Sequence, residues 1–228
     1  MGRTLVEVCV EDVPSALAAE AGGADRVELC AVMAVGGVTP GAGAIGLACE
    51  RLAIPVHALV RPRGGGFVYD DAEFEVMNRD ITTARELGAA GIVLGLLTPD
   101  GRIDRDRTAS LVERARPLSV TFHKAFDAAR DPFEALRTLI DLGIDRVLTS
   151  GRAPTAREGL DLLAQLDRES SGRLVIMAGG GITTADLPAL LAAGLREVHV
   201  GSSVTVPTDE GVSVTHAEKV RDLVQRLG

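Results

Sequence analysis

The sequence alternates between short runs rich in Val, Ile and Leu and longer stretches with the pattern of amphipathic helices. Short apolar runs separated by helices are typical of parallel βαβ units with right-handed crossovers. Eight runs are candidate strands: Leu5–Val10, Arg26–Leu29, Val56–Val60, Ile92–Leu94, Ser119–His123, Arg146–Thr149, Leu174–Met177 and Glu197–Val200. Dividing 228 residues among eight units gives a mean repeat of 28.5 residues. Such units form either a closed barrel or an open doubly wound sheet.

Helix boundaries and the first turn favour the barrel. Asp131 and Pro132 supply an N-cap and a first-turn proline for a helix over Phe133–Leu142, and Gly143 closes this helix. A dinucleotide-binding open sheet would carry a GxGxxG turn after its first strand, whereas residues 10–14 contain no glycine. The repeats are even, and no low-complexity linker interrupts them. We therefore predict one α/β domain over residues 1–228, folded as a (β/α)8 TIM barrel.

Charge and cysteine content exclude several classes of protein. The 24 basic and 32 acidic residues give a net charge of −8, so no nucleic-acid-binding surface is expected. The three cysteines form no CxxC pair, which excludes a disulfide framework and a zinc ribbon. The sequence contains no signal-peptide pattern and no apolar run near the roughly 18 residues of a membrane helix. We therefore expect a cytoplasmic protein that does not contact a membrane.

Side-chain alternation along the strands predicts polar residues inside the barrel. The first strand carries valines at alternate positions, which suit the helix layer, and this leaves Glu7 and Cys9 for the lumen. The second strand leaves Glu28 and Cys30 in the same way, so a Glu-x-Cys motif occurs on two neighbouring strands. The same reasoning turns further polar side chains inward: His57, Arg61, Thr121, His123, Glu197 and His199. Buried charges are costly unless they pair with each other or with a ligand. The alternative to a functional site is a network of Glu7, Glu28 and Arg61 that only fixes the barrel geometry.

Loops after three of the strands carry groups suited to an anion. Arg61 and Arg63 flank a proline and precede three glycines, so two guanidinium groups stand on a backbone that can approach a carboxylate or phosphate. The loops after the last two strands, where TIM barrels often bind phosphate, hold Gly180, Gly181 and Ser202. A flexible loop and tight turns would explain the same glycines without a ligand. We predict that both groups converge above the barrel and bind an anion.

His123, at the end of the fifth strand, is the candidate general acid or base. Its ordinary pKa of about 6.5 suits proton transfer near neutral pH. A core histidine bonded to a carbonyl is the alternative. The neighbouring Lys124 would suit a Schiff base, but alternation predicts that it lies on the face opposite His123.

Taken together, these motifs resemble the CutC family of copper-homeostasis TIM-barrel proteins. The resemblance rests on Glu7–Cys9, Gly23–Cys30, Gly36–Pro40, Arg61–Gly65, Met77–Ile81, Thr121–Asp127, Leu148–Gly151 and Gly179–Ile182. It runs from about Leu5 to His199. The chain departs from the family pattern at Lys124, where the family usually has Arg, and at Gly41 and Gly201, where it usually has Ser.

The resemblance implies a cytoplasmic protein that binds Cu(I) through Cys9 and Cys30, with Met33 as a possible third ligand. Thiolate and thioether sulfurs suit Cu(I), and neighbouring strands about 4.8 Å apart would let two sulfurs share one ion. Buried cysteines that only fill the core are the alternative.

A second hypothesis is a TIM-barrel enzyme that acts by acid–base chemistry on a small anionic, phosphorylated metabolite. His123 would move protons, and Glu28 or Asp127 would orient it or share that work. The ligand-binding set would comprise Glu7, Arg61, Arg63, Ser150, Gly180, Gly181, His199 and Ser202. Closed α/β barrels often form dimers, so a homodimer stays open as well.

Overall fold

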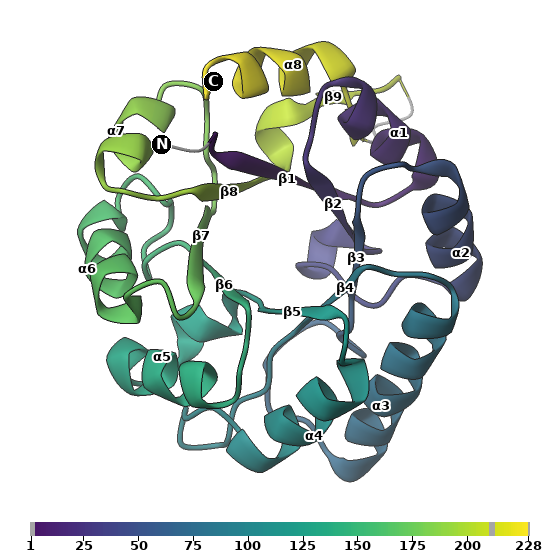
Figure 1. Ribbon diagram of the computed structural model, residues 1–228. Helices are drawn as coiled ribbons and strands as arrows, with labels where there is room; N and C mark the ends of the chain where they lie inside the picture. The colour runs from purple at the N-terminus through teal and green to yellow at the C-terminus, as the bar shows by residue number, and fades with distance from the viewer. Residues whose placement is uncertain (1–2, 210–212, 228) are drawn as a thin grey trace.

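The computed structural model describes residues 3–209 and 213–227. Eight parallel strands close into a barrel in chain order, with the last strand paired to the first (Figure 1). The strands are β1 (Leu5–Val10), β2 (Arg26–Leu29), β3 (Val56–Leu59), β4 (Gly91–Leu94), β5 (Ser119–Phe122), β6 (Arg146–Thr149), β7 (Val175–Gly179) and β8 (Glu197–Val200). The predicted (β/α)8 barrel is therefore confirmed.

Eight α-helices within the described residues surround the barrel as an outer ring (Figure 1). They are α1 (Val13–Ala21), α2 (Ala42–Arg51), α3 (Asp71–Glu86), α4 (Arg105–Ala115), α5 (Pro132–Asp141), α6 (Leu160–Ser170), α7 (Leu187–Ala192) and α8 (Ala217–Gln225). As predicted, Asp131 caps α5: its side chain accepts hydrogen bonds from the backbone N–H groups of Phe133 and Glu134. No described helix has both the length and the apolar character needed to cross a bilayer.

The main hydrophobic core lies between the strands and the helix ring. Val6, Val8 and Val10 are at most 2% exposed and belong to this core, as alternation predicts. A separate small apolar cluster, made of Cys9, Cys30, Leu59 and Val93, lies inside the barrel. The lumen is therefore apolar only in part, because buried polar side chains such as Glu7 and Arg26 share it.

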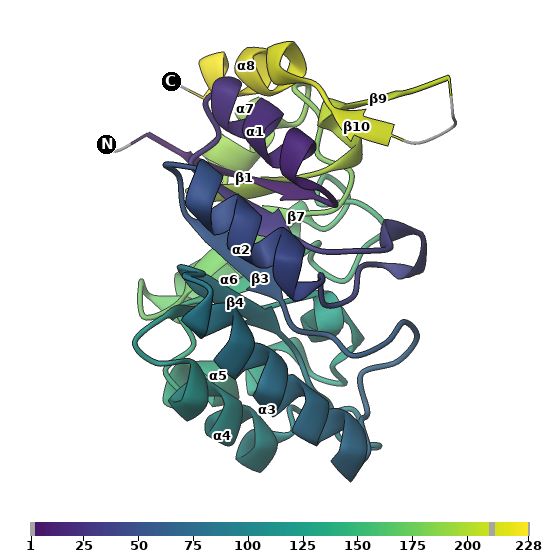
Figure 2. The same cartoon turned by 90° about the vertical axis from the view of Figure 1, so that its right-hand side faces the viewer.

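Short helices and one hairpin follow the carboxyl ends of the strands. The 3-10 helices are η1 (Met33–Val35), η2 (Lys124–Ala128) and η3 (Ser202–Val204). An antiparallel hairpin of β9 (Thr205–Pro207) and β10 (Ser213–Thr215), which the sequence analysis did not predict, projects to the right in Figure 2, the direction in which β1 points. We call this end of the barrel the mouth.

Candidate functional site

An ion-pair network occupies the lumen below the mouth. The Arg26 guanidinium donates to Glu7 Oε2 and to Glu197 Oε2, at 2.5 Å each, and Arg146 Nε donates to the same Glu197 oxygen at 3.1 Å. The predicted network of Glu7, Glu28 and Arg61 is wrong in its cation and in one carboxylate, because Arg26 pairs with Glu7 and Glu197, whereas Arg61 donates to loop carbonyls. Arg26 lies two residues before Glu28, so the two side chains point to the same face of β2. This spacing could have identified Arg26 as a residue of the lumen.

Glu7 links this network to His199. The two residues are direct neighbours across β1 and β8, and His199 Nδ1 lies 2.7 Å from Glu7 Oε1. Burial alone would raise the pKa of Glu7, but the charge of Arg26 and the hydrogen bond from His199 outweigh it and lower this pKa strongly. Burial opposes the charged form of His199, yet the hydrogen bond to Glu7 raises its pKa. Glu7 is therefore a buried carboxylate that accepts a hydrogen bond from His199.

Sulfur atoms from three segments meet beside this pair. Cys9 Sγ lies 3.6 Å from Cys30 Sγ and 3.7 Å from Met33 Sδ. The hydrogen bond with Cys30 and burial raise the pKa of the Cys9 thiol well above its usual range. Cys9 is therefore a neutral thiol in the metal-free protein at neutral pH. The predicted proximity of the two cysteines is present, with Met33 as a third sulfur.

Strained backbone holds Met33 in place. The preceding residue, Val32, has φ 54° and ψ 60°, a left-handed conformation that is rare for a β-branched side chain and costs about 1–3 kcal/mol. Met33 itself is 42% exposed, although its sulfur reaches the buried Cys9. Met33, the first residue of η1, is therefore the member of the sulfur cluster that is exposed at the protein surface.

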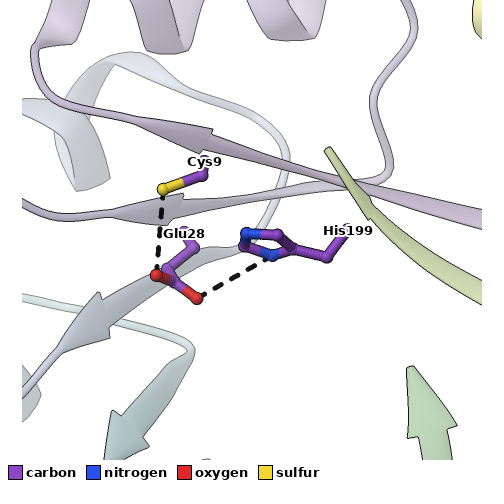
Figure 3. Close-up of side chains that lie close together, drawn as sticks. All are labelled: Cys9, Glu28 and His199. Atoms are coloured by element: carbon purple, nitrogen blue, oxygen red, sulfur yellow. Dashed lines mark hydrogen bonds and ion pairs between the residues drawn. The ribbon is translucent and has the colours of Figure 1, made fainter. Parts of the chain in front are cut away.

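Glu28 lies at the level of Cys9, its register partner on β1 (Figure 3). Cys9 Sγ is 3.8 Å from Glu28 Oε1, and His199 Nδ1 is 3.9 Å from Glu28 Oε2. Burial raises the pKa of Glu28 to about 7, although the charge of His199 opposes the shift. Glu28 Oε2 has no hydrogen-bond partner among the described residues. This carboxyl therefore changes charge near neutral pH and keeps one free oxygen.

These groups line a cavity of about 280 Å³ that opens at the mouth. Its lining comprises Cys9, Glu28, Met33, Gly36, Leu59, Arg61, Phe67, His123, Lys124, Leu148 and His199. The cavity combines soft sulfur donors, a carboxyl, two imidazoles and two cationic groups. This composition is compatible with a metal ion and with a small anionic molecule.

His123 lies in the cavity but in an environment that differs from the predicted one. β5 ends at Phe122, so His123 is the N-cap residue of η2. Its Nδ1 accepts a hydrogen bond from the backbone N–H of Ala125 at 3.1 Å. Burial and the charge of Arg61 lower the pKa of His123 to about 3. An imidazole that stays neutral and accepts at Nδ1 carries its proton on Nε2. His123 is therefore a hydrogen-bond donor to the cavity, because Nε2 has no partner among the described residues.

The prediction that Lys124 lies on the face opposite His123 is wrong. Alternation applies only while the chain is a strand, and η2 turns Lys124 back so that both side chains line the same cavity. The Lys124 ammonium lies within 3.4 Å of where a Cβ on Gly180 would stand. Lys124 thus brings the loop after β7 into contact with the cavity.

The two arginines of the loop after β3 have different places. Arg61 is 5% exposed, and its guanidinium donates to three loop carbonyls, those of Val35, Gly37 and Gly65. Arg63 pairs with Glu73 on α3 and is absent from the cavity lining. The prediction that both arginines converge on one ligand is therefore wrong for Arg63.

Several further predicted residues lie outside this cavity. The Asp127 carboxylate accepts from Thr149 Oγ1 at 2.5 Å, from the backbone N–H of Ser150 at 3.1 Å and from that of Arg152 at 2.9 Å. Asp127 and Ser150 therefore fix the loop after β6. Ser202 lines a neighbouring hollow of about 150 Å³, which it shares with Cys9. Gly180 and Gly181 have positive φ and form the turn after β7.

Comparisons with known proteins identify the same family that the sequence motifs resemble. The CutC family profile matches residues 4–204. The human copper homeostasis protein cutC homolog is 49% identical over 88% of this chain and 74% of its own length. A CutC family protein of Vibrio vulnificus is 47% identical over 97% of both chains.

A solved structure also points to the CutC family, and a second one shows the fold alone. A CutC structure from Streptococcus agalactiae superposes with a TM-score of 0.82 at 33% identity and covers 87% of this chain and 98% of its own. A phosphoribosyl anthranilate isomerase from Thermus thermophilus, 18% identical with a TM-score of 0.59, shares the barrel fold alone. Because the profile and these relatives cover most of the sequence, the chain belongs to the CutC family.

Proposed function

We propose that this protein acts in copper homeostasis by binding one Cu(I) ion at the barrel mouth. The ligands are Cys9 and Cys30, with Met33 as the third. The observation that carries the proposal is the convergence of three sulfurs, 3.6 Å and 3.7 Å from Cys9 Sγ. The names of the human and mouse relatives, both copper homeostasis protein cutC homologs, support the same role.

The sulfur geometry fits a Cu(I) ion with small adjustments. Metal–sulfur bonds near 2.3 Å at trigonal angles require sulfurs about 4 Å apart, a few tenths of an ångström more than the distances from Cys9. Gly37 leaves room for such an adjustment. A Cβ at this position would lie 3.5 Å from Cys30 Cβ and 3.7 Å from Met33 Sδ. The exposed part of Met33 provides the route by which an ion enters.

Copper binding of this kind requires reduced cysteines, and all three cysteines of the chain are free thiols. A cytoplasmic location is part of the proposal, because that compartment keeps thiols reduced and so preserves the sulfur ligands. The protein would receive Cu(I) by ligand exchange, with Met33 as the first contact.

Anaerobic titration of the purified chain with Cu(I), in competition with a chromogenic Cu(I) chelator, tests the proposal. We expect about one ion per chain in the parent protein. Cys9→Ser and Cys30→Ser should each lower the affinity by at least about a hundredfold, and Met33→Leu by less, because a thioether binds more weakly than a thiolate. Cys49→Ser is the matched control, since Cys49 lies on α2, outside the cluster. Equal Cu(I) affinity in the parent and both serine variants would overturn the proposal.

A second candidate function is binding and turnover of a small anionic metabolite in the same cavity. Its supporting observation is the buried His123 Nε2, which carries a hydrogen and has no acceptor in the part of the chain that the structure describes. Lys124 and Arg61 add positive charge to the same lining. Because the pKa of His123 is lowered to about 3, this residue would polarise a bound oxygen as a neutral donor, and Glu28 would be the proton carrier.

Calorimetric titration with inorganic phosphate tests this second function. Binding should weaken about tenfold or more in Lys124→Gln and in His123→Phe, which each remove a donor. Arg63→Gln is the control, because Arg63 lies outside the cavity. Absence of phosphate binding to the parent chain, or equal binding in all variants, would contradict an anion site.

A further inference from the structure

We propose that the mouth contains a second metal position, for a borderline divalent cation of the Zn²⁺ class, whose ligands are Cys9 Sγ, the Glu28 carboxylate and His199 Nε2. This position shares Cys9 with the proposed Cu(I) cluster but uses neither Cys30 nor Met33. It does not rest on the copper proposal. The mixed sulfur, oxygen and nitrogen donor set is one that Zn²⁺ accepts and that Cu(I) does not prefer.

The spacing of Cys9 and Glu28 matches tetrahedral coordination, and the imidazole of His199 lies close enough to complete it after a small movement. Cys9, Glu28 and His199 each offer one ligand atom, and these atoms lie within 4.8 Å of one another (Figure 3). Cys9 Sγ and Glu28 Oε1 are 3.8 Å apart. Zn–S and Zn–O bonds of about 2.3 Å and 2.1 Å at a tetrahedral angle require about 3.6 Å. An ion can therefore bridge these two groups with a shift of a few tenths of an ångström.

The environment of His199 is that of a metal ligand. Its Nδ1 lies 2.7 Å from the Glu7 carboxylate, and Arg26 keeps this carboxylate ionised. A neutral His199 therefore carries its proton on Nδ1 and leaves the Nε2 lone pair free. Histidines that bind metals commonly donate the other ring N–H to a carboxylate, which fixes the tautomer and the ring orientation. Glu7 supplies this contact from the register-matched position on β1.

Glu28 gives independent support. It is 5% exposed, and its Oε2 has no hydrogen-bond partner among the described residues. A buried carboxyl oxygen without a donor is costly, and a cation beside it removes that cost. Among the described residues, the group that could hold a metal has three members, Cys9, Glu28 and His199, and these line the cavity of about 280 Å³. Three protein ligands and one free position are typical of reactive rather than structural zinc sites.

The test uses the complete metal-free chain under anaerobic, reducing conditions, titrated with Zn²⁺ and separately with Co²⁺. We expect about one Zn²⁺ per chain, and a Co²⁺ complex with a thiolate-to-cobalt charge-transfer band and four-coordinate ligand-field bands. His199→Gln and Glu28→Gln should each lower Zn²⁺ affinity at least tenfold. Cys30→Ser should keep Zn²⁺ binding while it loses Cu(I). His216→Gln is the matched control, since His216 precedes α8 and is not part of the cavity lining.

The outcomes separate this site from the copper site. Loss of Cu(I) in Cys30→Ser with Zn²⁺ binding retained supports both, whereas retained Cu(I) binding in this variant contradicts only the copper proposal. No saturable Zn²⁺ binding to the parent chain, or a Co²⁺ spectrum without a thiolate band, overturns the divalent site. Because this spectrum is recorded on the unsubstituted protein, the result does not depend on whether the variants fold. Circular dichroism checks their folding separately.

Discussion

Replacing Arg26 by Met would remove the cation that the lumen carboxylates share. Arg26 contacts both Glu7 and Glu197, and its side chain is 7% exposed. Glu197 keeps Arg146 as a partner, whereas Glu7 keeps His199 and His57 among the described residues. The variant therefore isolates the cost of leaving Glu7 buried beside a neutral side chain.

Glu28 indicates the size of this cost. Burial raises its pKa to about 7, and its ion-pair partner among the described residues is His199, not an arginine. If Glu7 without Arg26 behaved similarly, its pKa would lie roughly three units above the ordinary value of about 4.3. At about 1.4 kcal/mol per unit, this change corresponds to about 4 kcal/mol at pH 7. The value agrees with the roughly 3–5 kcal/mol found when one partner of a buried ion pair is removed.

The pH dependence of this cost gives a sharper test. In the parent protein the folded pKa of Glu7 is lowered, so its stabilising contribution is present above the unfolded pKa and is lost as pH falls. In Arg26→Met the folded pKa would lie above the unfolded one, so the penalty grows as pH rises from about 4.3 to 7. The stability difference between parent and variant should therefore be largest near pH 7 and shrink towards pH 4.

Urea unfolding followed by far-ultraviolet circular dichroism measures these differences, since the chain contains no Trp. Adding Glu7→Gln to Arg26→Met should restore part of the lost stability, because it removes the unpaired charge. Arg79→Met is the control: it breaks an exposed pair with Glu75 on α3 and should cost only a few tenths of a kcal/mol. A cost below about 1 kcal/mol for Arg26→Met at pH 7, or one that does not change with pH, would refute the reasoning.

Three further predictions concern the mouth. Arg61→Ala removes three hydrogen bonds to loop carbonyls and should lower the free energy of unfolding by about 3 kcal/mol. Arg63→Ala should lower it by clearly less, and equal losses in urea unfolding would contradict the structural role of Arg61. Because the pKa of the Cys9 thiol is raised, Cu(I) must displace its proton, and the apparent affinity should rise up to about tenfold per pH unit between pH 6 and 8; a flat profile in the chelator competition would count against this. Gly95→Ala would place a Cβ 2.4 Å from His123 Cε1, so the ring must move, and its NMR signals should shift in this variant; unchanged signals would show that the ring has not moved.

Alternation succeeded where the chain is a strand and failed where the strand had ended. It placed Glu7 and Cys9 correctly in the lumen, because both lie inside β1. It failed for Lys124, because β5 stops at Phe122 and a 3-10 helix follows. Strand ends depend on loop packing that no short sequence window contains.

Pairing between charged residues could not be predicted from composition. Alternation places Arg61 and Arg26 on the same kind of inward-facing position, but only the barrel register shows that Arg26 lies opposite Glu7. Backbone carbonyls of two loops accept hydrogen bonds from the terminal nitrogens of Arg61 instead. The Met33 contact likewise depends on the left-handed Val32, a conformation that its residue type argues against.

The register between β1 and β2 has a consequence for how a duplicated motif is used. The two Glu-x-Cys copies do not lie side by side, because Cys9 pairs with Glu28 and Glu7 pairs with Arg26. The second copy is displaced by two residues along the barrel axis, so the corresponding residues of the two copies lie at different depths in the barrel. One glutamate is thereby held ionised next to an arginine, and the other titrates near neutrality beside a thiol. The stagger of the closed barrel strands thus gives the two copies of one Glu-x-Cys motif different surroundings, and its two glutamates acquire different protonation behaviour.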